Sequence, residues 1–252
     1  MKKVHKIIII IVSLCVVIVA GGFGYLYLNG LSGISNNTKP QDGQIKVACV
    51  GDSITYGHGI SNWPSNNYPA VLQELLGDEY HVANFGSSGS CVNPDGDQPY
   101  VERSVYHDSI AYDADILVIM LGTNDSKPEN WTDEQTFMED YMDLLEAYLS
   151  GEKMPKVYIC LPAEAYYAED ADSELAKFDI QPQIVDEIAK ATAEVQFMYN
   201  LFGIHTNTQV VDIHSLTEEH PEWFEVDGIH PSAEGAKGIA EMIAEAILED
   251  AN

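Results

Sequence analysis

Ser53 follows Gly51 and Asp52 where a short apolar run ends, and its hydroxyl could act as a nucleophile. A serine hydroxyl reacts poorly until a neighbouring base takes its proton. His230 can be that base, and Asp227, three residues earlier, can accept the other ring N–H and fix its tautomer. Serine after Gly-Asp is also a common turn and helix cap. The three side chains together nevertheless predict acyl transfer.

Acyl transfer also needs preorganised hydrogen-bond donors for the oxyanion that develops on the substrate. The backbone N–H groups of Ser53 and Gly89 and the side-chain amide of Asn124 are the candidates for this oxyanion hole. Glycine at position 89 would let the backbone approach the substrate. His58 is too near Ser53 in the chain to be the expected base and ranks below His230. Five other histidines have no such companions in the sequence: His81, His107, His205, His214 and His220.

The elements that must position these residues alternate along the chain between short apolar strands and helical periodicity. The expected strands are Ile45–Val50, Tyr80–Asn84, Asp115–Leu121, Lys156–Leu161 and Thr208–Ile213. The expected helices are Tyr68–Leu76, Asp133–Leu149, Gln183–Val195 and Ala233–Leu248, with a looser region over Gln98–Ile110. This alternation predicts an α/β fold in which helices cover both faces of a parallel sheet. Ligands of such sheets gather at the carboxyl ends of the strands, where Gly51-Asp52-Ser53 falls.

Four short motifs resemble, in order, the blocks of the SGNH hydrolases (GDSL esterases and lipases). They are Gly-Asp-Ser at 51–53, Asn-x4-Gly at 84–89, Gly-x-Asn-Asp at 122–125 and Asp-x-x-His at 227–230. The resemblance runs from about Ile45 to Leu248. It implies a three-layer α/β/α sandwich with a parallel five-stranded sheet, flavodoxin-like, and the catalytic and oxyanion-hole roles given above. A conventional α/β-hydrolase is disfavoured, because the segment 86–90 lacks the last glycine of Gly-x-Ser-x-Gly.

Three longer stretches look like bacterial acetylesterases of this group, including sialate O-acetylesterase-like proteins. They read LGTNDSKPENW (121–131), CLPAEAY (160–166) and DGIHPSAEGAKGIA (227–240). This resemblance implies short-acyl esters of carbohydrate as substrates. Asp52 and Trp131 are the candidate substrate-binding residues; Trp131 could stack on a sugar, or simply pack the loop before the next helix.

The composition narrows the classes of ligand. The chain has 252 residues with 40 acidic and 12 basic side chains, a formal net charge of −28. Such a surface repels phosphate backbones and argues against nucleic-acid binding. Cys49 and Cys160 lie in apolar runs and are expected in the core, while a disulfide within the set Cys49, Cys91 and Cys160 stays open. No Cys/His cluster has zinc-ligand spacing. Acyl transfer by a serine, histidine and aspartate needs neither a metal nor an organic cofactor, so none is expected.

The N-terminus predicts export. Residues 1–28 combine basic residues with an uncharged stretch from Ile7 to Leu28, long enough to span a bilayer. We expect an uncleaved anchor that tethers residues 45–252, the hydrolase domain, to the outer face of the cytoplasmic membrane. Cleavage after Gly22, giving a secreted protein, is the alternative. Residues 29–44 are polar, rich in Gly, Ser and Asn, and are expected to be a flexible linker.

The leading hypothesis is therefore an extracellular serine esterase that removes acetyl or other short acyl groups from a small-molecule or glycan ester. One alternative within the same chemistry is a lipase, lysophospholipase or thioesterase; a cell-wall O-acetylesterase is another. A non-catalytic glycan-binding module is the alternative of a different class, but it would be expected to have a broken triad. The sequence gives no oligomeric state.

Overall fold

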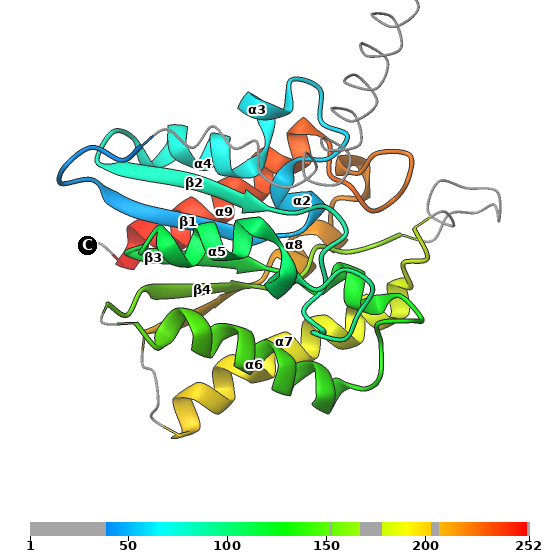
Figure 1. Cartoon of the computed structure of the whole chain (residues 1–252). Helices are drawn as coiled ribbons and strands as arrows, with labels where there is room; N and C mark the ends of the chain where they lie inside the picture. Colours follow the sequence, from blue (N-terminus) through cyan, green and yellow to red (C-terminus); the bar gives the residue numbers. More distant parts are fainter. Residues whose placement is uncertain (1–38, 152, 167–177, 203–206, 251–252) are drawn as a thin grey trace, which may run out of the picture.

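The computed structural model describes residues 39–151, 153–166, 178–202 and 207–250. At its centre lies a parallel sheet in the order β2-β1-β3-β4-β5 (Figure 1). The strands are β1 (Ile45–Gly51), β2 (Tyr80–Gly86), β3 (Ile116–Met120), β4 (Lys156–Cys160) and β5 (Thr208–Val211). This order is that of flavodoxin-like sheets and confirms the predicted fold class.

Helices cover both faces of the sheet, which gives three layers (Figure 1). One face packs against α5 (Ser104–Ala111), α6 (Glu134–Leu149) and α7 (Pro182–Phe202). The other packs against α4 (Tyr68–Leu76) and α9 (Ala233–Asp250). Successive strand residues point to opposite faces, so Val50 enters the first core and Cys49 the second. The strands are apolar on both faces because neither face meets water.

The predicted elements differ from the observed ones at strand ends and in two helices: α7 continues beyond the predicted end at Val195 to Phe202, and α5 lies in the region predicted only as looser. β2 continues to Gly86, and β5 stops at Val211 because the Asp212 side chain caps a new helix by accepting from the Ser215 N–H. The short helices were not predicted, since a single turn has too few residues to show a period. They are α2 (Ser53–Tyr56), α3 (Trp63–Asn66) and α8 (Ile213–Glu218), with 3₁₀ turns η1 (Tyr100–Glu102), η2 (Thr123–Ser126) and η4 (Pro221–Trp223).

The carboxyl ends of the central strands meet in register. Gly51, the last residue of β1, pairs with Gly86 of β2 on one side and with Met120 of β3 on the other. The chain leaves each strand at the same edge and turns there into α2, into the loop after Gly86, and into η2. The residues that follow these strands therefore start within a few ångströms of one another.

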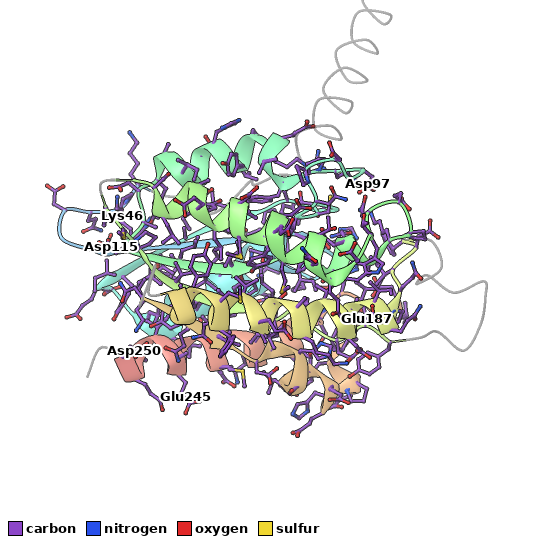
Figure 2. All side chains as sticks on the ribbon, turned by 90° about the horizontal axis from the view of Figure 1, so that it is seen from below. Lys46, Asp97, Asp115, Glu187, Glu245 and Asp250 are labelled. Carbon is purple, nitrogen blue, oxygen red and sulfur yellow. The ribbon has the colours of Figure 1, made fainter. Side chains whose placement is uncertain are left out.

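Charged pairs occupy the opposite edge. The Lys46 backbone N–H donates to Asp115 over 2.8 Å, Lys153 pairs with Asp115 over 2.7 Å, and Lys156 pairs with Asp250. Figure 2 shows Lys46, Asp115 and Asp250 at one end of the molecule and Asp97 toward the other. Lys46, Lys153 and Lys156 thus lie at the edge of the sheet opposite the carboxyl ends of its strands.

The described residues contain no helix long and apolar enough to cross a membrane. The predicted anchor and most of the predicted linker fall outside them. Cys49, Cys91 and Cys160 are all buried and free, so the core placement expected of Cys49 and Cys160 is confirmed.

Candidate active site

Ser53 is the first residue of α2, immediately beyond the carboxyl end of β1. The Asp52 side chain caps this helix by accepting from the Ile54 N–H over 2.9 Å. Gly57 ends it with a φ of 92°, a left-handed conformation that suits glycine. Ser53 keeps 8% of its surface exposed, so its hydroxyl reaches a pocket while its backbone is fixed. The helix cap is thus Asp52 and not Ser53, and the role of Ser53 as a nucleophile stays a prediction that this position allows.

His230 and Asp227 come from the loop between η4 and α9 and meet Ser53 across 177 positions of sequence. The Ser53 Oγ lies 2.8 Å from His230 Nε2, and His230 Nδ1 lies 2.6 Å from Asp227 Oδ2. A carboxylate can only accept, so Nδ1 carries the proton and Nε2 accepts from the serine hydroxyl. The imidazole therefore holds the tautomer that a base acting on Ser53 requires.

The loop that holds Asp227 is fixed by its own backbone. Asp227 Oδ1 accepts from the N–H groups of Ile229 and His230, each over 2.9 Å. Burial raises the pKa of Asp227, but the hydrogen bonds from the His230 ring and from these two N–H groups outweigh it and hold the pKa at about 2. Asp227 is therefore ionised at neutral pH and faces an imidazole that is itself almost fully buried.

The candidate oxyanion donors line the same pocket as Ser53 and His230. Gly89 has a φ of 79°, and a Cβ there would lie 2.7 Å from the Gln98 side chain, so both conformation and space favour glycine. Asn124 lies in η2, after β3, and its side-chain N–H group donates to the Ser90 carbonyl over 3.1 Å. The structure thus brings together all five residues predicted for catalysis and the oxyanion hole.

Asp125, next to Asn124, supports this geometry and was not singled out from the sequence. Its carboxylate accepts from the backbone N–H groups of Val92 and Asn93 at 2.9 to 3.0 Å, which ties η2 to the loop that carries Gly89. Complete burial raises the pKa of Asp125 to about 7, although these N–H groups oppose the shift. The only signal in the sequence was that Asp125 is the last residue of the Gly-x-Asn-Asp motif.

The pocket has a volume of about 400 Å³, within the usual range for small ligands. Phe178, Ile180 and Ile229 form its apolar part. The remaining lining residues are polar or are glycine: Ser53, His58, Ser87, Ser88, Gly89, Gln98, Arg103, Thr123, Asn124, Lys127 and His230. A pocket of this kind can hold a small apolar group beside several hydroxyls.

The two candidate substrate-binding residues are not part of this lining. Asp52 is 1% exposed. Its carboxylate accepts hydrogen bonds from the Ile54 N–H and, over 3.4 Å, from the Asn124 side-chain amide. Burial raises the pKa of Asp52 to about 6, although the Ile54 N–H and His230 lower it. Trp131 packs against Phe137 with 6.3 Å between ring centroids, at the margin of a core. Asp52 is therefore a helix cap, and Trp131 takes the second of the two roles considered for it, packing; substrate binding by either residue stays a prediction.

His58 also lines the pocket, although it ranked below His230 as a candidate catalytic base. Its ring centroid lies 4.6 Å from that of His230, and Phe178 meets the edges of both rings. Burial lowers the pKa of His58, and the neighbouring His230 lowers it further, while Asp227 acts in the opposite direction. A neutral His58 can donate or accept one hydrogen bond to a ligand. Only its nearness to Ser53 in the chain pointed to it.

Two cations also face the pocket, although the chain is acidic overall. Arg103 donates to Gln98 and, over 3.3 Å, to the Ser90 hydroxyl, and Lys127 pairs with Asp97 over 2.9 Å. Both cations are thus held by partners in the loop region around residues 90–98. They bring hydrogen-bond donors to the pocket while Asp97 offsets the charge of Lys127.

Comparison with known proteins places the chain in a family. Residues 49–237, more than half of the chain, match the GDSL-like Lipase/Acylhydrolase family. The chain belongs to this family. It is also 36% identical over 226 residues to an acetylxylan esterase of Xylanibacter ruminicola, an alignment that covers 82% of this chain and 44% of that protein. The chain thus spans less than half the length of this relative.

Solved structures share the fold of this GDSL-family chain. A carbohydrate acetylesterase of Sinorhizobium meliloti, Est24, superposes with a TM-score of 0.63 at 19% identity, covering 82% of this chain and 99% of its own. An aryl esterase of M. smegmatis gives a TM-score of 0.63 at 18% identity, covering 81% and 99%. The predicted family and its three-layer fold are confirmed.

Proposed function

We propose that this chain is a serine esterase that hydrolyses short-chain acyl esters, with O-acetyl groups on carbohydrate as the foremost substrates. The observation that carries the proposal is the chain of hydrogen bonds from Asp227 through His230 to Ser53, which opens into the pocket. Membership of the GDSL-like Lipase/Acylhydrolase family supports ester hydrolysis. A binding module without activity would not need this arrangement.

In the first half of the reaction Ser53 Oγ attacks the ester carbonyl carbon while its proton passes to His230 Nε2. The imidazolium that forms is stabilised by the ionised Asp227, 2.6 Å from Nδ1. The oxyanion accepts from the N–H groups of Ser53 and Gly89 and from the Asn124 amide. When the tetrahedral intermediate collapses, His230 gives the proton to the departing alcohol oxygen and the acyl group stays on Ser53.

The second half repeats these steps with water. His230 takes a proton from a water molecule, which attacks the acyl carbon, and then returns that proton to Ser53 Oγ as the carboxylic acid leaves. Because each proton is taken and returned by the same nitrogen, the residues named above complete the cycle. No metal ion or organic cofactor takes part in the proposed reaction.

The lining of the pocket supports a short acyl group and a polar alcohol. The apolar wall of Phe178, Ile180 and Ile229 can hold an acetyl methyl, whereas Gln98 and Arg103 offer donors to sugar hydroxyls. The name of the Xylanibacter relative, acetylxylan esterase, agrees with an acetylated polysaccharide. The same apolar wall could also hold a longer acyl chain. The test therefore includes substrates of lipases and lysophospholipases.

The test is a hydrolysis panel with the purified full chain. p-Nitrophenyl esters from acetyl to long-chain acyl, acetylated xylan, acetylated sialic acid and lysophospholipid would be compared for wild type and Ser53→Ala. Ser150→Ala is the matched control, because Ser150 is exposed and lies after α6, near the start of β4. We expect acetyl esters to be preferred and only S53A to lose activity. Equal rates in S53A and wild type would exclude the serine mechanism, and preference for long acyl chains would exclude the acetylesterase.

We further propose that the protein works outside the cytoplasmic membrane, tethered by residues 1–28. The basic start and the uncharged stretch from Ile7 to Leu28 support this location. Expression of the full chain in bacteria, followed by membrane fractionation and protease treatment of intact spheroplasts, tests it. Recovery of the protein in the culture medium would favour cleavage after Gly22 instead, and protection from protease would contradict export.

A further inference from the structure

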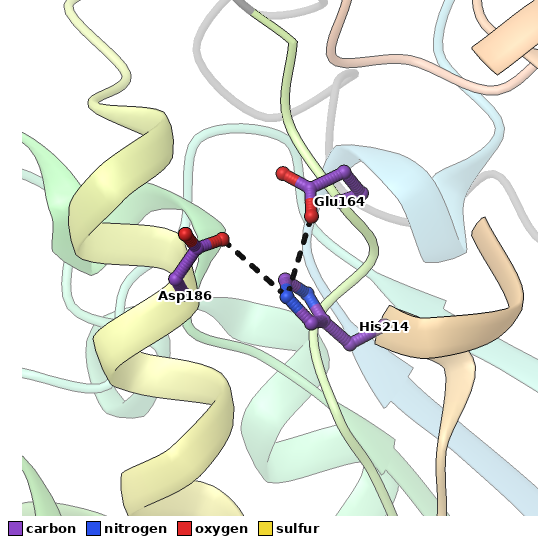
Figure 3. Close-up of side chains that lie close together, drawn as sticks. All are labelled: Glu164, Asp186 and His214. Carbon is purple, nitrogen blue, oxygen red and sulfur yellow. Dashed lines mark ion pairs between the residues drawn. The ribbon is translucent and has the colours of Figure 1, made fainter. Parts of the chain in front are cut away.

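A second group of ionisable side chains lies outside the pocket of Ser53. Glu164, Asp186 and His214 converge from the segment after β4, from α7 and from α8 (Figure 3). One nitrogen or oxygen atom of each lies within 4.8 Å of the others. All three line a separate cavity of about 700 Å³, and no described residue lines both this cavity and the proposed active site. No companions of His214 were expected from its neighbours in the chain, because the three residues lie far apart in the sequence.

The orientation of the imidazole is set from the side away from the carboxylates. His214 Nδ1 lies 3.1 Å from the carbonyl oxygen of Pro162, which can only accept, so Nδ1 carries a proton. In the neutral ring the Nε2 lone pair then faces Glu164 Oε2 at 3.3 Å and Asp186 Oδ1 at 3.4 Å. A backbone carbonyl that accepts from one ring nitrogen is the usual support of a histidine whose other nitrogen binds a metal.

Three electron-rich atoms pointing at one spot require a positive charge between them. The described lining of this cavity contains two further acids, Asp212 and Glu218, and among those described residues its one lysine or arginine is Lys190, at an exposed position. Burial raises the pKa of Glu164, and the charges of Asp186 and Glu218 raise it further against the lowering effect of His214. A proton on Nε2 would supply one positive charge for two carboxylates, and a divalent cation would supply two.

Two of the three ligand spacings match those around a tetrahedral ion, and the third pair of atoms lies within 4.8 Å. Ligands bound at about 2.0–2.1 Å to a tetrahedral ion lie roughly 3.3–3.4 Å apart, and the Nε2 atom is 3.3 Å and 3.4 Å from the two carboxylate oxygens. The Asp186 side chain is 48% exposed, while those of Glu164 and His214 are 11% and 15% exposed. An ion could therefore enter past Asp186 and keep water as a further ligand. An imidazole with two carboxylates suits Zn²⁺ and similar transition-metal ions better than Ca²⁺ or Mg²⁺, which take oxygen ligands.

We propose that Glu164, Asp186 and His214 form a binding site for a divalent transition-metal ion, with Zn²⁺ as the reference metal. The ion joins three elements that are separate in the chain: the segment after β4, the start of α7 and α8. The Tyr166 N–H, two residues beyond Glu164, donates to the Gly228 carbonyl over 2.9 Å, within the loop of Asp227 and His230. The bound ion thus stabilises the side of the fold against which that loop rests.

The test measures binding and unfolding, independently of ester hydrolysis. The full chain is stripped with a chelator, and Zn²⁺, Mg²⁺ and Ca²⁺ are each titrated by calorimetry and by thermal unfolding. Asp186→Asn and His214→Ala are the test variants. His220→Ala is the matched control, because His220 also pairs with a carboxylate, Glu222, over 2.9 Å, but is half-exposed and has no second ion-pair partner among the described residues.

We expect Zn²⁺ to raise the melting temperature of wild type and H220A, as an ion that binds only the folded state must. Loss of His214 should weaken Zn²⁺ binding by at least about a hundredfold, since even outer residues of metal sites contribute about ten- to a hundredfold. Asp186→Asn, at the more exposed position, should weaken it while leaving the fold intact. Both variants should bind one ion fewer per chain than wild type, measured by mass spectrometry.

Three outcomes would overturn the proposal. Undiminished Zn²⁺ binding by both test variants would place the metal elsewhere. Stabilisation by Ca²⁺ or Mg²⁺ but not by Zn²⁺ would exclude a transition-metal site. No Zn²⁺ binding by wild type would leave the three side chains as a plain ion-pair cluster.

Discussion

Gly86 allows α2, the helix that begins with Ser53, to lie directly on the end of β2, and Gly86→Ala tests this dependence. A Cβ at position 86 would lie 2.2 Å from the Tyr56 backbone nitrogen, 2.7 Å from the Tyr56 Cα and 2.8 Å from the Thr55 carbonyl carbon. An unstrained contact needs about 3.5 Å, so α2 and β2 must separate by about 1.3 Å. All three atoms are backbone, and no rotamer change relieves the clash.

Two consequences follow from this displacement. Overpacking of this kind costs about 1–3 kcal/mol of the free energy of unfolding. A shift of about 1 Å at a catalytic group can cost about a hundredfold in rate. We therefore expect Gly86→Ala to lower kcat/KM for p-nitrophenyl acetate by about two orders of magnitude and to lower Tm.

The assay combines esterase kinetics with thermal unfolding followed by circular dichroism. Gly151→Ala is the control, because Gly151 is exposed and the nearest atom to a Cβ there is 3.5 Å away. We expect G151A to behave as wild type, and a G86A protein that fails to fold beside a folded G151A still supports the steric argument. A G86A variant as active and as stable as G151A would refute it.

Asp227→Asn should lower kcat by about 10⁴, as loss of the tautomer-fixing carboxylate does in serine protease triads. Because the folded pKa of Asp227 is held at about 2, its stabilisation is present above the unfolded value of about 3.9 and is lost as pH falls toward 2. Wild type should thus lose roughly 2 kcal/mol more between pH 5 and 2 than the Asn variant in urea unfolding, and identical pH profiles would contradict this assignment. Gly89→Ala should reduce kcat with little effect on KM, because a side chain at a φ of 79° displaces an oxyanion donor; a change in KM alone would contradict that role. Asp125→Ala should destabilise the protein by about 2 kcal/mol or more, since the N–H groups of Val92 and Asn93 lose their acceptor; unchanged Tm would show that water replaces the carboxylate.

The elements were predictable from the sequence where their patterns are long. The helix Tyr68–Leu76 has the expected bounds, and the buried positions of α6, among them Phe137, Tyr141 and Leu144, have the expected spacing. Short helices such as α2 and α8 were not predicted, because a helix of four to six residues has no measurable period. The strand ends were off by one or two residues, since capping by a side chain such as Asp212 decides them locally.

The roles of individual polar residues were less predictable. Asp52 and Trp131 stand beside site residues in the sequence, but the structure turns the first into α2 and the second toward Phe137. His58 was ranked below His230 as the base, and it is His230 that contacts Ser53, but the place of the His58 ring beside that of His230 was not predicted. Nearness in sequence does not fix the direction of a side chain, because each turn after a strand can present it to the pocket or to the core.

The fold class, the family and the order of the polar motifs follow from the sequence alone. Strand and helix periods act over a few residues, and three of the four motifs come at strand ends, which share one edge in any parallel sheet, while the fourth precedes α9. The 2.8 Å contact between Ser53 and His230, the polar lining of the pocket, and the meeting of Glu164, Asp186 and His214 depend on the tertiary structure. Those contacts join residues that are distant in the chain, so they exist only once the sheet is paired and its helices are packed.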